Sequence, residues 1–254
     1  MSKPTRFVFA SDSHGDHADP KALSALYEFC RDFRPTVRIA GGDHFDFRSL
    51  RKGKDDTENN ESLNEDLAAG FDFFARYRPT VYQWGNHEAR LDAHIRSSGS
   101  AMFREACESI KDKINAHARK CGAKVILPYN AKKGVYRFGD REQITTAHGY
   151  SCGLNATKEM GLHYAVRGGA FIHGHTHSVE QVALRREGGG AAFSAGWLGL
   201  NDSMDYSATR LATARHSNAF VAGWVDGDDW KVFIVEPTAG RWTWPSDFKT
   251  FSPR

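Results

Sequence analysis

Residues 7–14, Phe-Val-Phe-Ala-Ser-Asp-Ser-His, join a short apolar run to two side chains of a kind that binds metals. Phe7 to Ala10 predicts a buried β-strand, since short apolar runs rich in aromatic and β-branched residues favour strands. Asp12 and His14 follow directly after this strand. In open α/β sheets, binding sites form at the carboxyl ends of the strands. The stretch therefore predicts a sheet and the edge at which a site is built.

The same arrangement, an apolar run followed by Gly, Asp, Asn or His, occurs four more times. The blocks are Gly41-Gly42-Asp43-His44-Phe45-Asp46, Gly85-Asn86-His87-Glu88, Ala147-His148-Gly149 and His173-Gly174-His175-Thr176-His177. Each block alone is explained as a turn or as an exposed strand, in which alternate residues share a face. All five together, each beside a glycine that permits a tight turn, indicate a metal site.

The elements between these blocks predict an α/β fold. Strands are expected at Val37–Ala40 and Val81–Trp84, and helical spacing is found around Ala22–Phe29, at Leu63–Tyr77 and at Ser100–Lys120. This β-α-β-α-β order favours a parallel or mixed sheet covered by helices. The second half holds closely spaced strand candidates, at Val125–Leu127, Val135–Phe138, Gln143–Ala147, Ala170–Ile172, Val179–Leu184 and Ala191–Ala195. A helical pattern at Asn155–Val166 interrupts them.

The last two strand candidates, Phe220–Val225 and Trp230–Val235, flank Asp226-Gly227-Asp228-Asp229, which is a strong hairpin signal. We therefore expect a single α/β domain over residues 1–254, with two sheets in a β-sandwich core flanked by helices.

Composition narrows the class of protein. Of 254 residues, 40% are hydrophobic and 12% aromatic, enough for a large core. No run approaches the roughly 18 apolar residues of a membrane span, and the N-terminus lacks a signal peptide, so we expect a cytoplasmic protein that does not bind membranes. Four scattered cysteines without a CxxC pair argue against disulfides or a cysteine-based zinc site. The net charge of +3 neither requires nor excludes nucleic acid as a partner.

The five blocks resemble the signature of the calcineurin-like metallophosphoesterases: Asp-x-His, Gly-Asp-x-x-Asp, Gly-Asn-His-Glu, a lone His and Gly-His-x-His. The C-terminal part looks most like the small single-domain members from bacteria and their viruses. The resemblance implies two metal ions that share Asp43 as a bridging ligand. One ion would be held by Asp12, His14, Asp43 and His177, and the other by Asp43, Asn86, His148 and His175.

Oxygen and imidazole ligands without thiolate suit Mn, Fe, Zn, Co and Ni. We expect Mn to be the bound metal, with the other four as alternatives. Two such ions lower the pKa of a shared water, which as hydroxide attacks phosphorus, and they clamp the oxygens of the ester. A mononuclear zinc hydrolase needs three protein ligands and one open position, fewer than the candidates here. The expected activity is that of a metal-dependent phosphoesterase.

The resemblance also implies roles beyond metal binding. His87 would face the substrate and protonate the leaving alkoxide. Asp46 matches the acid that pairs with this histidine in protein phosphatases, although an ordinary turn residue is the alternative. Asn86 is also a candidate for contact with the substrate. His173 shares a strand face with His175 and is the first of the remaining histidines to test as a ligand.

The sequence departs from the phosphoprotein phosphatases after Asp46. Those enzymes have Arg-Gly there, and the arginine holds phosphate, whereas Phe47-Arg48 stands here. Arg48, Arg51 or Arg90 are candidates to replace it. The departure favours a phosphodiester substrate, as for a nuclease or nucleotide phosphodiesterase.

Two alternatives stay open: a phosphomonoesterase or protein phosphatase, supported by Gly-Asn-His-Glu-x-Arg, and a non-catalytic metal-binding scaffold. Nucleic acid is a candidate partner, and no particular oligomeric state is predicted. Four further residues either line a substrate groove or lie on the surface: Tyr206, Arg210, Arg215 and His216.

Overall fold

The computed structural model describes residues 4–51, 62–200 and 216–245, and its strands form two main sheets. The first sheet has the order β11-β10-β1-β2-β3-β4. Its strands are β1 (Thr5–Ala10), β2 (Val37–Ala40), β3 (Val81–Gln83), β4 (Val125–Leu127), β10 (Phe220–Asp226) and β11 (Asp229–Val235). The second has the order β5-β6-β7-β9-β8. Its strands are β5 (Tyr136–Phe138), β6 (Ile144–Ala147), β7 (Ala170–His173), β8 (Val179–Ala183) and β9 (Ala191–Ala195).

Parallel pairing brings the ends of several strands to common edges. Strands β1 to β4 pair in parallel, while β10 runs antiparallel to β1, with Phe7 opposite Gly223. In the second sheet β6, β7 and β9 are parallel to one another. The turns after β1, β2 and β3 therefore leave the first sheet at one edge, and those after β6 and β7 leave the second sheet together.

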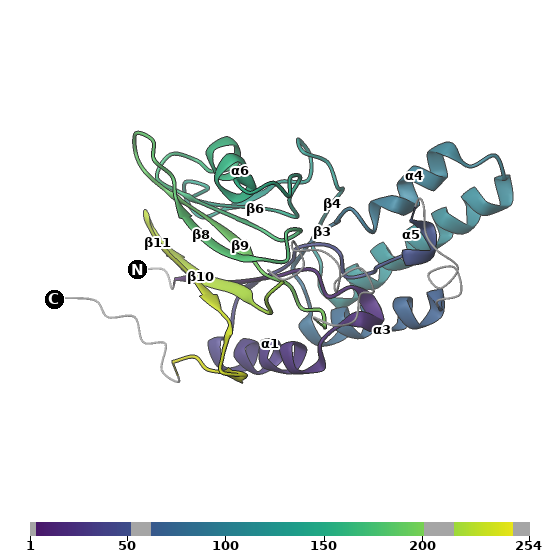
Figure 1. The fold of residues 1–254 in the computed structure, drawn as a ribbon, viewed down its shortest axis with the longest axis horizontal. Coiled ribbons are helices and arrows are strands. Elements are labelled where there is room, and N and C mark those ends of the chain that lie inside the picture. Colours follow the sequence, from purple (N-terminus) through teal and green to yellow (C-terminus); the bar gives the residue numbers. More distant parts are fainter. Residues whose placement is uncertain (1–3, 52–61, 201–215, 246–254) are drawn as a thin grey trace.

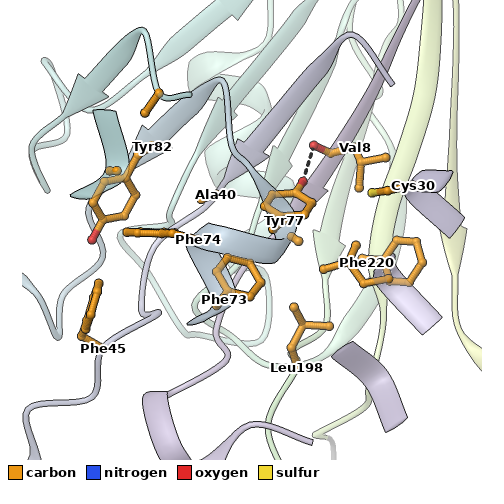
Figure 2. Packing of buried hydrophobic residues seen from close by; sticks show 14 of the residues in the cluster. Val8, Cys30, Ala40, Phe45, Phe73, Phe74, Tyr77, Tyr82, Leu198 and Phe220 are labelled. Carbon is orange, nitrogen blue, oxygen red and sulfur yellow. Dashed lines mark hydrogen bonds between the residues drawn. The ribbon is translucent and has the colours of Figure 1, made fainter. Parts of the chain in front are cut away.

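The alternation of side chains along the strands builds the layers. Phe7 and Phe9 of β1 pack between the sheets, with Ile172 of β7, while Val8 points to the opposite face. Figure 2 shows that face, where the hydroxyl of Tyr77 lies 3.0 Å from the carbonyl oxygen of Val8. Each sheet is thus apolar on both faces, as a four-layer arrangement requires.

Helices cover the two outer faces (Figure 1). Helices α1 (Pro20–Phe33), α3 (Leu63–Tyr77) and α5 (Ala101–Cys121) contribute to the core on the first sheet, and α6 (Ala156–Tyr164) to that on the second. The starts of these three helices on the first sheet are capped by side chains: Asp19 accepts a hydrogen bond from the Lys21 amide, Ser62 from that of Glu65, and Ser100 from that of Phe103. A small sheet of β12 (Pro237–Thr238) and β13 (Arg241–Trp242) completes the strands described.

The expected two-sheet α/β fold with flanking helices is confirmed, and several strand bounds agree with it to the residue. The strand expected at Val81–Trp84 ends at Gln83. Helix α4 (Ala89–Ser97) was not expected, and Leu91 is its single buried residue, so it carries no apolar stripe to reveal it. Among the residues described, none of the helices has the length and apolar character to cross a membrane.

Candidate metal centre

The turns at the carboxyl ends of β1, β2, β3, β6 and β7 carry the polar blocks, and they meet between the two sheets. Among the residues described, three groups of three side chains each place one ligand atom per residue within 4.8 Å of the others, and the third, His14, Asp46 and His87, shares His14 with the first. The first group is Asp12, His14 and His177, and the second is Asp43, His148 and His175. Both are buried except for the partly exposed His175.

In the first group, three atoms with lone pairs converge. The Nε2 atoms of His14 and His177 lie 3.0 Å apart, and Oδ1 of Asp12 lies 3.3 Å from Nε2 of His177. This Oδ1 is buried without a hydrogen-bond partner, as is Nδ1 of His14. Trp197 stacks on the imidazole of His177, with ring centroids 4.8 Å apart, and so fixes the orientation of the ring.

In the second group, the orientation of His148 is set by its backbone contact. Its Nδ1 donates to the carbonyl oxygen of Gly41 at 2.9 Å, which directs Nε2 toward Oδ2 of Asp43 at 3.2 Å. Oδ1 of Asn86 lies 3.0 Å from the same Nε2. Nε2 of His148 therefore points at two oxygen atoms, those of Asp43 and Asn86, which are of a kind that binds metal ions.

The backbone around these groups is strained. Ten residues other than glycine have a positive φ in the part of the chain described, and five of them are predicted ligands: Asp12, His14, Asp43, His175 and His177. A left-handed conformation is costly for residues with a Cβ and persists where the surroundings impose it. Half of these positions are thus predicted ligands, a concentration that the sequence pattern does not reveal.

Two buried carboxylates that the sequence did not single out hold the turns in place. Glu88 accepts hydrogen bonds from the backbone N–H groups of Asp43, His44 and Gly85, at 2.9, 2.8 and 2.9 Å. Asp66 of α3 accepts from the N–H groups of Asp46 and Phe47. These partners are 19 to 45 residues away along the chain or within a tight turn, so no local pattern reveals them.

The buried carboxylates and imidazoles of the centre shift one another's pKa values. Burial disfavours the charged form of Asp12, but the neighbouring imidazoles of His148 and His177 outweigh burial and lower the pKa of this carboxyl. Burial likewise opposes the imidazolium of His148, yet Asp43 and Asp12 raise its pKa to about 10. Burial and the charge of His148 lower the pKa of His175 to about 4. His175 is thus neutral near pH 7, the form in which imidazole binds metals.

His87 and Asp46 lie beside the two groups as a hydrogen-bonded pair. Nδ1 of His87 is 2.5 Å from Oδ1 of Asp46, and its Nε2 is 3.8 Å from Oδ2 of Asp43. Burial opposes the charged imidazole, but Asp43 and Asp46 raise the pKa of His87. Nη2 of Arg90 lies 3.1 Å from Nε2 of His87, which places this guanidinium at the exposed side of the ring.

The candidate arginines differ in their surroundings. Arg48 donates to Asp46 at 2.8 Å and to Asp16 at 2.8 and 3.0 Å, so its guanidinium lies between two carboxylates. Nη1 of Arg90 donates to the carbonyl oxygens of Asp46 and Phe47, and it lies 3.6 Å from Oδ1 of Asp46. Arg51 follows the short helix η2 (Arg48–Leu50), and its N–H donates to the carbonyl of Arg48.

The remaining candidates are more distant or fall outside the residues described. His173 is directed away from the ligand groups: its Nε2 is 3.1 Å from the hydroxyl of Thr157 in α6. The face shared with His175 is lost because β7 ends at His173 and His175 has φ +69°. His216 packs against His177, with ring centroids 4.6 Å apart. Tyr206, Arg210 and Arg215 lie outside the residues described.

The donor set fits divalent metal ions. It combines carboxylate, imidazole and carboxamide atoms without thiolate, and the unpaired Oδ1 of Asp12 is an atom of the kind that a metal satisfies. The buried histidine and aspartate groups can therefore hold metal.

No protein-family model and no curated protein matches this chain. Solved structures with similar folds include YfcE, a phosphoesterase from E. coli, with 14% identity, a TM-score of 0.38 and coverage of 87% of this chain and 88% of that one. Vacuolar protein sorting 29 from Cryptosporidium parvum has 10% identity and a TM-score of 0.42, over 95% and 96% of the two chains. PhoD has 11% identity and a TM-score of 0.47, over 91% and 66%. Because these scores are low, the function proposed below rests on the chain's own residues.

Proposed function

We propose that this protein is a phosphoesterase that depends on two divalent metal ions. The convergence of two groups of lone-pair atoms beside the His87–Asp46 pair carries the proposal. A single structural ion would use one group, and it would not need a hydrogen-bonded imidazole–carboxylate pair beside it.

The proposed ligands of one ion are Asp12, His14, Asp43 and His177, and those of the other are Asp43, Asn86, His148 and His175. Asp43 bridges the two in this proposal. Its Oδ2 faces His148 at 3.2 Å, and its carbonyl oxygen accepts the N–H of His14 at 2.9 Å, which ties it to both groups. When bound, the two ions lower the pKa of water and neutralise charge on the phosphoryl oxygens.

His87 protonates the leaving oxygen in this scheme. The proton on Nδ1 is held by Asp46, so the imidazolium can release only the proton on Nε2, the atom that faces Asp43 and Arg90. Asp46 thereby selects which nitrogen acts. Arg90, beside this atom, is placed to contact an oxygen of the ester.

A phosphodiester is the favoured substrate. A terminal phosphate carries two charges and is usually bound by arginines that present two N–H groups. Arg48 directs its N–H groups to Asp46 and Asp16, which leaves Arg90 as the guanidinium beside His87. A singly charged diester needs less positive charge than a terminal phosphate does. A monoesterase is the second candidate, and Arg90 is the observation in its favour.

The test compares hydrolysis of bis-p-nitrophenyl phosphate and p-nitrophenyl phosphate by purified protein with added Mn, Zn, Co or Mg, after metal content is measured. We expect faster turnover of the diester, with Mn the best activator. A strong preference for the monoester would overturn the choice of diester. Metal-loaded protein that cleaves neither ester nor DNA would favour the metal-binding scaffold.

A further inference from the structure

We propose that Arg48 is a positioning residue, which holds Asp46 and through it His87, and that Asp16 holds Arg48 in turn. This proposal rests on the proposed function and deepens it, because it removes Arg48 from the groups that bind the phosphate.

The first step concerns the two oxygens of the Asp46 carboxylate, which is 2% exposed. Oδ1 faces His87, at 2.5 Å from Nδ1, and Oδ2 receives Nη1 of Arg48 at 2.8 Å. A carboxylate that is bonded through both oxygens cannot rotate without losing one bond. Arg48 therefore fixes the plane in which Oδ1 meets His87.

The second step concerns the other end of the guanidinium. Nη2 of Arg48 lies 2.8 and 3.0 Å from the two oxygens of Asp16. Asp16 belongs to η1 (Gly15–His17), which follows the turn with Asp12 and His14, and Arg48 begins η2 after the turn with Asp43 and Asp46. One guanidinium thus links the turns that follow β1 and β2.

The third step concerns the packing beneath this link. Asp66 of α3 accepts the N–H groups of Asp46 and Phe47, and a Cβ added to Gly15 would lie 1.9 Å from Oδ1 of Asp66. Gly15 has φ +57°, so this close contact and this backbone both require glycine. Both turns that lead into η1 and η2 therefore contact Asp66 of α3, and Arg48 links them through its bonds to Asp16 and Asp46.

The fourth step concerns charge. The Arg48 side chain is 10% exposed, and its Nη1 and Nη2 contact the carboxylate oxygens of Asp46 and Asp16. Binding a phosphate here would bring a third anion to the same guanidinium and would displace either Asp46 or Asp16. Replacing Asp46 would release His87, the group on which turnover depends.

The test is a double-mutant cycle with Arg48→Met, Asp16→Asn and the double variant, in the full-length protein loaded with Mn. We expect Arg48→Met to lower kcat for bis-p-nitrophenyl phosphate about tenfold, as loss of an outer-shell partner typically does. KM should change by less than about twofold, because no contact with the substrate is lost. Asp16→Asn should lower kcat less, and the double variant should equal Arg48→Met, since Asp16 acts through Arg48.

A second readout does not depend on activity. In metal-free protein, the Nδ1 proton of His87, identified by its absence in His87→Asn, should give a far-downfield NMR signal because its bond to Asp46 is short. We expect this signal to shift in Arg48→Met and, by less, in Asp16→Asn. Arg31→Met, at an exposed surface arginine, is the matched control and should change neither readout.

A rise in KM with kcat unchanged in Arg48→Met, together with a neutral Asp16→Asn, would assign Arg48 to phosphate binding and overturn the proposal. An unchanged His87 signal in both variants would do the same. If Arg48→Met does not fold, Asp16→Asn alone tests the proposal: its kcat should fall and its His87 NMR signal should shift. If the wild-type protein hydrolyses no phosphate ester, the proposed function fails, and the NMR readout still decides whether Arg48 holds Asp46.

Discussion

The edges of the two sheets meet at the candidate metal centre, but they are held in different ways. The turns of the first sheet are anchored by buried carboxylates, Glu88 and Asp66, which accept backbone N–H groups. In the turns of the second sheet, the hydroxyl of Thr176 lies 2.7 Å from that of Ser194 and the N–H of Gly174 donates to the carbonyl of His148, while the N–H of His175 donates to Asp12 of the first sheet at 3.0 Å.

The difference assigns different tasks to the two edges. Glu88 and Asp66 each accept two or more backbone N–H groups, and so tie neighbouring turns of the first edge to one another. This edge carries Asp43, Asp46 and His87, which in the proposed function set the geometry of proton transfer. The second edge carries the imidazoles of His148, His175 and His177, which in the proposed function bind the ions. Four predictions test this division, from the largest effect to the smallest.

The first prediction compares one ligand from each edge. Asp43→Asn should lose both ions, and its activity should fall by more than the roughly 100-fold typical of outer-shell changes, because the bridging carboxylate is removed. His175→Asn should lose one ion. Metal content after gel filtration, measured by atomic emission, distinguishes the two, and equal loss in both variants would contradict a bridge at Asp43.

The second prediction concerns His87 on the first edge. His87→Asn should keep both ions while kcat falls about 10²- to 10⁴-fold, the usual contribution of a general acid. The loss should be greatest for esters with poor leaving groups, which need the proton most. A series of aryl phosphate esters of rising leaving-group pKa measures this dependence. Loss of metal in this variant would place His87 among the ligands instead.

The third prediction compares the anchors themselves. Glu88→Gln keeps the shape of the side chain but presents an amide to backbone donors, so affinity for Mn should fall about 10- to 100-fold. Thr176→Val, the matched change on the second edge, should cost about 1 kcal/mol of stability and leave Mn affinity nearly unchanged. Isothermal titration with Mn and urea unfolding measure the two quantities. Similar Mn affinities in both variants would contradict the prediction that the anchors of the first edge support metal binding more than those of the second.

The fourth prediction concerns pH. Burial raises the pKa of Asp66 from 3.8 to about 6 despite its bonds from Asp46 and Phe47. The folded protein then holds this proton more tightly than the unfolded chain, so the resulting stability is complete below about pH 4 and is lost as the pH rises through 6. Asp66→Asn should abolish that part of the pH dependence. Urea unfolding in chelator from pH 4 to 7 measures it, and parallel curves for the two proteins would contradict the shift.

Much of the fold could be predicted from the sequence because its strands are short apolar runs with distinct ends. Val37–Ala40 and Ala191–Ala195 are bounded by glycine or polar residues, and the structure has both strands at these bounds. Helix α4 could not be predicted, since it buries only Leu91. The place of β10 beside β1 also escaped prediction, because its partners are more than 200 residues apart and no local signal specifies them.

The candidate site also has residues that the sequence predicts and residues that it does not. The sequence names the side chains that the structure brings together, since each follows a strand directly. It does not name their supports. Glu88 and Asp66 act on backbone groups, and Arg48 was assigned to the substrate because charge alone cannot tell an arginine that faces a ligand from one that faces carboxylates.

The pairing of β10 with β1 bears on how the chain reaches this structure during synthesis. β1 lies inside the first sheet, between β2 and β10. The ribosome synthesises β2 soon after β1, but it synthesises β10 much later. Until residues 220–226 leave the ribosome, one side of β1 has no hydrogen-bonding partner from β10. The nascent protein thus holds an open strand edge beside Asp12 and His14, which a chaperone or a premature metal ion can reach before the sheet closes.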